Sequence, residues 1–205
     1  MDDALLKVRW DELVTACGLS LEKAERYYHG LLRAYSEPHR AYHNPNHLQH
    51  VFAELESAGV ADTAVAWAVW YHDAIYRPGA KDNEARSADL ARQEMKALGL
   101  APDLVGRVAQ LILATRSHQG AAADTVEALF LDADLAILGA APDEYDNYKR
   151  AIRAEHGNVP SLLYNRGRRQ FLRQMLQRPR IFHSDHFYAR YEQRARANMA
   201  EELAG

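Results

Sequence analysis

Apolar residues recur along the chain at the three- and four-residue spacing that is typical of amphipathic helices. In the segment from Ser20 to Pro38 the apolar face consists of Leu21, Ala24, Tyr27, Tyr28, Leu31 and Leu32. The same spacing, with polar residues or proline at the starts and glycine at several ends, predicts helices over residues 44–59, 64–76, 82–99, 102–115, 124–138, 142–156, 160–177 and 184–203. No segment alternates with a period of two, so we predict no strand. The expected fold is all-α, with about nine or ten helices.

The helix expected over residues 64–76 is apolar on nearly every side. Such a helix belongs in the middle of a fold, because none of its faces suits contact with water. No linker, repeat or low-complexity segment divides the chain. We therefore expect a single domain over residues 1–205, with a core at about residues 42–138 and basic C-terminal helices at about residues 142–203.

The composition excludes several classes of protein. The 205 residues include 25 basic and 28 acidic side chains, a formal charge of −3, and 48% of the residues are hydrophobic. These values are ordinary for a globular chain and argue against disorder. Cys17 is the one cysteine, which excludes an intramolecular disulfide and a zinc module held by several cysteines. The acidic start Met1-Asp2-Asp3 and the shortness of every apolar run predict a cytoplasmic protein without a membrane span.

Basic residues are concentrated toward the C-terminus. Residues 149–196 hold 12 basic and 3 acidic side chains, a net charge of +9, so the rest of the chain carries −12. Two interpretations stay open: solvated helix faces, or a cationic wall that faces a phosphorylated ligand. A nucleic-acid partner is not indicated, because the pI is about 6.4 and no reader motif is present.

Histidine and aspartate residues occur in four places where a divalent cation could use them. His43 and His47 flank the start of the helix that Asn44 is expected to cap, so their rings can approach one point from different directions. His72 and Asp73 are adjacent near the end of the apolar helix, about 100° apart if both are helical. They can share an ion only if it lies between their two directions.

The other two places are a pair of aspartates and a lone histidine. Asp132 and Asp134 interrupt an apolar segment, and two helical positions differ by about 200°, so at most one of them should face an ion. His118 follows an apolar helix and is either a ligand or an ordinary loop residue. A buried carboxylate without a partner is strongly penalised, and these apolar segments offer few arginines. A shared cation would satisfy several such groups, and mixed imidazole and carboxylate ligands suit Mn, Fe, Co, Ni or Zn better than Ca.

The order His47, then His72-Asp73, then Ala133-Asp134-Leu135 resembles the HD-domain superfamily of metal-dependent phosphohydrolases. The resemblance covers about Tyr42 to Leu138 and implies an HD-type helical bundle. It implies that His47, His72, Asp73 and Asp134 are metal ligands for one or two divalent ions, with Mg as an option at a second position. Asp134 is preferred to Asp132 because the last ligand of the family commonly stands between alanine and an apolar residue.

The segment Tyr42-His43-Asn44-x-x-His47 also resembles the signature of cyclic-nucleotide phosphodiesterases, in which the first histidine is the general acid. By this resemblance His43 is the acid. For the hydrolysis itself, Asp73 is the best candidate to orient the attacking water or to bridge a second ion. Tyr76 stands where those enzymes carry a further histidine, which argues against a cyclic-nucleotide substrate. The whole chain is similar to a bacterial branch of HD phosphohydrolases. We therefore expect hydrolysis of a small, nucleotide-like phosphate ester, by a monomer or a homodimer.

Four further residues are weaker candidates for contacts around this site: Glu84, His118, Asp132 and Arg168. Glu84 either stabilises the start of its helix or orients a ligand or a water molecule. Arg168, with its neighbours Arg166 and Arg169, would contact phosphate only if its helix faces the site. Two other functions stay open: a di-iron oxygenase on the HD fold, in which His118 is an additional ligand, and a regulatory module that binds a nucleotide without turnover.

Overall fold

A computed structural model describes residues 3–119, 122–123 and 125–205, and all of its regular structure is helical. The described residues contain ten α-helices and one short 3-10 helix, so the all-α prediction is confirmed. The chain divides into two compact units, Met1–Gln119 and Gly120–Gly205. Asp124, where one helix was predicted to begin, lies outside the described residues. The prediction of a single domain stays a prediction.

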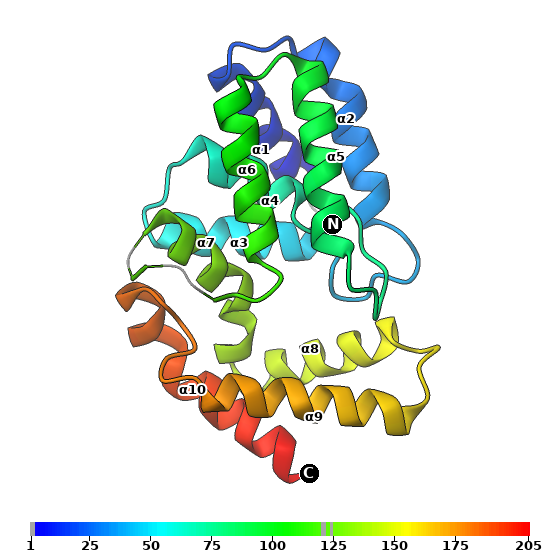
Figure 1. Ribbon diagram of the computed structural model, residues 1–205, viewed down its shortest axis with the longest axis vertical. Coiled ribbons are helices and arrows are strands. Elements are labelled where there is room, and N and C mark those ends of the chain that lie inside the picture. The colour runs from blue at the N-terminus through cyan, green and yellow to red at the C-terminus, as the bar shows by residue number, and fades with distance from the viewer. Residues whose placement is uncertain (1–2, 120–121, 124) are drawn as a thin grey trace. The chain divides into compact units, whose positions relative to one another are not determined.

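The first unit contains six helices (Figure 1): α1 (Asp3–Ala16), α2 (Leu21–Tyr35), α3 (Pro45–Ser57), α4 (Thr63–Tyr71), α5 (Asn83–Leu98) and α6 (Pro102–Ala114). Helix α4 is at its centre, because it packs against α1, α3, α5 and α6. Most of its side chains are buried, and Trp67 and Trp70 pack edge-on against Trp10 of α1. The prediction that the wholly apolar helix lies in the middle is confirmed for this unit.

Two predicted helix starts in this unit are confirmed in detail. The side chain of Asn44 accepts a hydrogen bond from the N–H of Asn46, and Pro45 occupies the first turn of α3. The carboxylate of Asp62 accepts hydrogen bonds from the N–H groups of Ala64 and Val65 at the start of α4. These caps fix the points at which the chain enters both helices.

The predicted extent of the apolar helix, residues 64–76, is wrong at its C-terminal end. Helix α4 ends at Tyr71, and His72 is its C-cap. Two of the N–H groups beyond it bond to side chains: Asp73 N–H donates to Tyr35 Oη at 3.2 Å, and Ile75 N–H donates to Ser87 Oγ at 3.0 Å. The helix ends here because these polar side chains replace the carbonyl groups of a further helical turn. Asp73 consequently lies on a turn.

The second unit contains α7 (Val126–Leu135), a 3-10 helix (Ala136–Gly139), α8 (Pro142–Glu155), α9 (Ser161–Gln177) and α10 (Asp185–Ala204). Helices α8 and α9 form an antiparallel pair in Figure 1. The 3-10 helix packs closely on α10, and a Cβ atom on Gly139 would lie 2.6 Å from Cβ of Tyr191. Only glycine fits at this contact, because any side chain would overlap α10.

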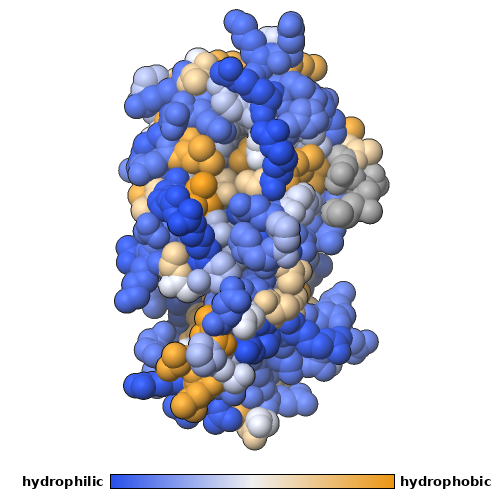
Figure 2. All heavy atoms as spheres, turned by 90° about the vertical axis from the view of Figure 1, so that its right-hand side faces the viewer, coloured by the Kyte–Doolittle hydropathy of each residue, from blue (hydrophilic) through white to orange (hydrophobic). Residues whose placement is uncertain are grey.

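The surface has no large apolar patch on the face that Figure 2 presents. That face is mostly hydrophilic, with small separate hydrophobic groups. Scattered exposed apolar side chains are normal for globular proteins. Among the described residues, no helix combines the length and the apolar character needed to cross a lipid bilayer.

Candidate metal centre

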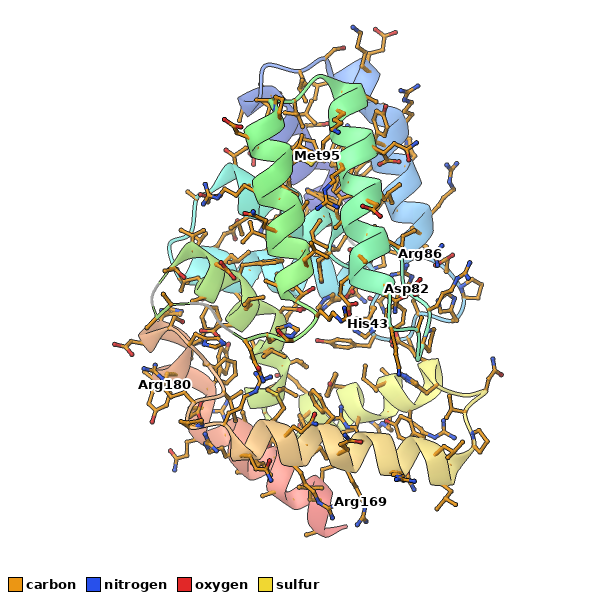
Figure 3. The ribbon with its side chains drawn as sticks, in the orientation of Figure 1. His43, Asp82, Arg86, Met95, Arg169 and Arg180 are labelled. Carbon is orange, nitrogen blue, oxygen red and sulfur yellow. The ribbon has the colours of Figure 1, made fainter. Side chains whose placement is uncertain are left out.

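Three elements of the first unit bring four predicted site residues together. His47 lies in the first turn of α3, and His43 lies in the loop just before the capping residue Asn44. His72 caps the C-terminus of α4, and Asp73 follows it on the turn. Figure 3 shows His43 at the same end of this unit as Asp82, where α5 begins before it runs toward Met95. The site therefore lies where α3 starts and α4 ends.

The ligand atoms of three of these residues converge. Nε2 of His47 lies 3.1 Å from Nε2 of His72, and Oδ2 of Asp73 lies 3.3 Å from Nε2 of His72 and 3.8 Å from Nε2 of His47. The histidine side chains are each 1% exposed and that of Asp73 is 17% exposed. The two imidazoles are thus buried, and the Asp73 carboxylate is the most exposed of the three groups.

The backbone fixes the orientation of the His72 ring. Its Nδ1 lies 2.9 Å from the carbonyl oxygen of Val69, and because a carbonyl only accepts, Nδ1 carries the hydrogen. In the neutral ring Nε2 then presents a lone pair toward His47 and Asp73. This arrangement, with a backbone carbonyl holding the far nitrogen, is the usual support for a histidine that binds a metal through Nε2.

The donor set fits a divalent transition metal. Ligand atoms that lie about 2.1 Å from one ion, at angles of about 90–130°, are about 3.0–3.8 Å apart. The three separations between His47, His72 and Asp73 fall in that range. Two imidazole nitrogens and one carboxylate oxygen suit Mn, Fe, Co, Ni or Zn. When no cation is bound, two Nε2 atoms 3.1 Å apart form a favourable contact only if one of them carries a hydrogen and the other accepts it.

His43 lies at the more exposed edge of this group. Its Nε2 is 3.9 Å from Oδ2 of Asp73, its side chain is 19% exposed, and its ring packs 4.2 Å from the ring of Tyr76. His43 is thus the most exposed histidine of the group. Tyr76, which the sequence marked only as a departure from a family pattern, is its packing partner.

Sequence reasoning missed two buried residues that hold this site, Arg40 and Tyr35. The Arg40 side chain is 0% exposed and donates hydrogen bonds to the backbone around both His43 and Asp73. Tyr35 is also 0% exposed, and its hydroxyl accepts the N–H of Asp73. In the sequence Arg40 has an acidic neighbour, Glu37, three residues earlier, so it looks like an ordinary local ion pair, and its Nε does donate to Glu37 at 3.1 Å. No local signal in the sequence therefore indicated that Arg40 bonds to the backbone of the site.

The two aspartates of α7 lie in the second unit and differ in environment. Asp132 is fully buried and accepts hydrogen bonds from His183 N–H at 2.8 Å and from Ser184 N–H and Oγ–H at 2.7 Å each. Its carboxylate therefore stabilises the start of α10. Burial raises the pKa of Asp132 above its ordinary value, although these three donors oppose the shift. Asp134 is half-buried on the same helix, and its place among the ligands stays a prediction.

Two other weak candidates belong to the first unit. Glu84 is half-buried in the first turn of α5, where an acidic residue favours the helix dipole. Its neighbours Asn83 and Ser87, which the sequence did not single out, bond to the backbone of Arg77 and Ile75 after the site turn. His118 follows α6 with φ of +49°, and its role as an additional ligand stays a prediction.

Arg168 has a partner within its own unit. Its guanidinium binds Glu202 through Nε at 2.8 Å and Nη2 at 3.0 Å, and it donates to the hydroxyl of Tyr148 at 3.1 Å. Burial opposes ionisation of Glu202, but hydrogen bonds from Arg168 and Tyr145 lower its pKa overall. Arg168 is therefore a structural residue of the second unit. Its neighbours Arg166 and Arg169 are exposed.

Comparisons of the chain with protein-family models, with curated proteins and with solved structures found no match. The functional argument consequently depends on the residues of the site.

Proposed function

We propose that the chain is a metal-dependent phosphohydrolase of the HD type, which cleaves a phosphate ester of a small, nucleotide-like molecule. The observation that carries the proposal is the convergence of His47 Nε2, His72 Nε2 and Asp73 Oδ2 within 3.1–3.8 Å of one another. A buried group of this composition is costly unless a cation or a proton neutralises it. Its order in the sequence supports the HD assignment.

The proposed divalent cation would supply Lewis-acid polarisation of a phosphoryl oxygen and activation of water. His47 and His72 would hold it through their buried Nε2 atoms, and the bond from His72 Nδ1 to the Val69 carbonyl keeps the His72 ring in the orientation that this requires. Asp73 would be the third ligand, and because its side chain is the most exposed of the three, at 17%, the same carboxylate would also be able to orient the attacking water. Asp134 is proposed as the fourth ligand on the basis of the sequence motif.

His43 is proposed to protonate the leaving oxygen. It stands at the exposed edge of the group, 3.9 Å from the Asp73 carboxylate, where a bound ester would arrive. The ordinary pKa of an imidazole lies close to neutral pH, which suits a residue that both holds and releases a proton. The packing of Tyr76 against the His43 ring, 4.2 Å between ring centres, restricts its orientation.

The proposal is tested by measuring phosphate release from a panel of nucleotides. The chain is stripped with a chelator and assayed with added Mn, Fe, Co, Ni, Zn or Mg. We expect turnover that depends on one of these metals, is abolished in His72→Ala and is retained in His29→Ala. His29 is a matched control because its side chain is exposed on α2 and pairs with Glu25. Equal activity in all three proteins, or hydrolysis that survives the chelator, would contradict the proposal.

A further inference from the structure

Arg40 joins the two backbone segments that carry the site residues. Its Nη1 donates to the carbonyl oxygen of Asp73 at 2.6 Å and to that of His43 at 3.3 Å. Its Nη2 donates to the carbonyl oxygen of Ala74 at 3.1 Å, and its Nε donates to Glu37 at 3.1 Å. One guanidinium therefore bonds both to the loop before α3 and to the turn after α4.

Aromatic rings enclose the same guanidinium. The carbon Cζ of Arg40 lies 5.1 Å from the ring centre of Tyr35 and 5.4 Å from that of Tyr76. The side chain is 0% exposed, so its hydrogen bonds act where water does not compete. Tyr76 in turn packs on His43, so the stack runs from Arg40 to the ring at the edge of the site.

The backbone of Asp73 is held on both sides of its Cα atom. Its N–H donates to Tyr35 Oη at 3.2 Å, and its carbonyl oxygen accepts from Arg40 at 2.6 Å. With both peptide groups fixed, the direction of the Asp73 side chain relative to His72 is also restricted.

We propose that Arg40 is a positioning residue, which sets the separation between His43 and Asp73 by bonding to the backbone of both. The inference rests on the proposed function for its meaning in catalysis. The structural part of the inference, that Arg40 holds the loop before α3 and the turn after α4 together, can be tested in the metal-free chain and does not depend on that function. Removing a residue that hydrogen-bonds to a metal ligand commonly lowers metal affinity or activity about 10–100-fold.

Lysine cannot replace arginine in this role. A guanidinium is planar and donates in several fixed directions at once, whereas an ammonium group is a compact charge on a flexible stem. Arg40→Lys keeps the charge but cannot bond to His43, Asp73 and Ala74 in the observed arrangement. Arg40→Ala removes all of these bonds and leaves a space that free guanidinium can enter. The matched control is Arg107→Lys, because Arg107 pairs with Asp62 in the same unit and is 53% exposed.

The first experiment is hydrogen–deuterium exchange of the metal-free proteins. We expect faster exchange in Arg40→Lys at residues 42–46 and 73–76, with α1 unchanged, and no change in Arg107→Lys. The second is a titration with Mn²⁺ or Zn²⁺, in which the dissociation constant should rise about 10–100-fold in Arg40→Lys. In Arg40→Ala, millimolar guanidinium should restore part of the lost affinity and, where turnover exists, part of kcat with little change in KM.

Unchanged exchange in both segments, or wild-type metal affinity in Arg40→Lys, would overturn the proposal. Global unfolding of both Arg40 variants would also overturn it, since Arg40 would then be required by the fold as a whole. Failure of the proposed function is distinguishable, because it would appear as absent metal binding or turnover in the wild type. The exchange measurement needs neither metal nor substrate and decides the role of Arg40 in that case as well.

Discussion

Replacing His43 by alanine should separate metal binding from catalysis. His43 lies in the loop before α3, and its Nε2 is 3.9 Å from Asp73 Oδ2, whereas His47, His72 and Asp73 lie 3.1–3.8 Å apart. If the latter three hold the ion, its affinity should change little in the variant. The rate should fall because a leaving oxygen must then depart without a proton donor.

The expected size of the effect follows from what a positioned acid supplies. Such proton transfer contributes about 10²–10⁴-fold, which corresponds to about 2.7–5.4 kcal/mol in the activation free energy. The cost in stability should be small by comparison. His43 is partly exposed, at 19%, and its main packing partner is Tyr76. Substitution of a partly exposed side chain such as this usually lowers the free energy of unfolding by under about 1 kcal/mol.

The assay compares two substrates that differ in their need for an acid. Hydrolysis of a p-nitrophenyl ester releases p-nitrophenolate, a stable anion that needs no proton. Hydrolysis of a nucleotide ester releases a nucleoside, whose alkoxide is strongly basic and needs a proton from an acid. We expect His43→Ala to lose about 10²–10⁴-fold in kcat/KM on the nucleotide and much less on the p-nitrophenyl ester. His29→Ala should match the wild type on both. Loss of bound metal in His43→Ala, or equal losses on the two substrates, would refute the assigned role.

Three further predictions concern stability. Asp132→Asn should destabilise the fold by about 1–3 kcal/mol in urea unfolding, because the amide group turns a donor toward the N–H groups of His183 and Ser184; an unchanged midpoint would contradict this. Arg168→Met should cost about 3–5 kcal/mol by the same measurement, since it removes the cation from the half-buried Glu202 carboxylate and leaves it with the hydrogen bond from Tyr145, and a cost under about 1 kcal/mol would show that the pair is not structural. Burial raises the pKa of Glu94 in the folded chain above its ordinary value of 4.5. The folded state therefore holds this proton more tightly than the unfolded state, and the contribution of the protonated carboxyl to the free energy of unfolding, present at low pH, is lost as the pH rises through the raised value. Glu94→Gln should therefore raise the melting temperature at pH 7 and leave it nearly unchanged at pH 4. A gain at pH 4 with none at pH 7 would contradict a raised pKa for Glu94.

Much of the helical structure could be predicted from local signals. Asn44-Pro45 and Asp62 mark the starts of α3 and α4 through hydrogen bonds that form within one turn. The N-terminal helix α1 could not be placed, because apolar side chains are not confined to one face of it. Leu6 and Trp10 are buried there, whereas Leu5 and Val8 are 44% and 52% exposed.

The end of α4 could not be predicted because it depends on residues distant in the sequence. Apolar residues continue beyond His72-Asp73 in Ala74 and Ile75, so the sequence shows no stop there, whereas Tyr35, Arg40 and Ser87 bond to the backbone of Asp73 and Ile75 just after the helix. The convergence of His47, His72 and Asp73 was expected from the motif order, but the geometry that brings Asp73 in depends on this turn. Likewise, nothing local in the sequence assigned Asp132 to the start of α10.

A calorimetric titration of the chelator-treated chain with Zn²⁺ and Mn²⁺ tests the central claim most directly. We predict saturable binding that weakens as the pH falls, because ligand histidines must lose their protons. Binding should be lost in His72→Ala and Asp73→Ala and retained in His29→Ala. The same affinity in all four proteins, or no binding by the wild type, would contradict the proposal that His47, His72 and Asp73 form a metal centre.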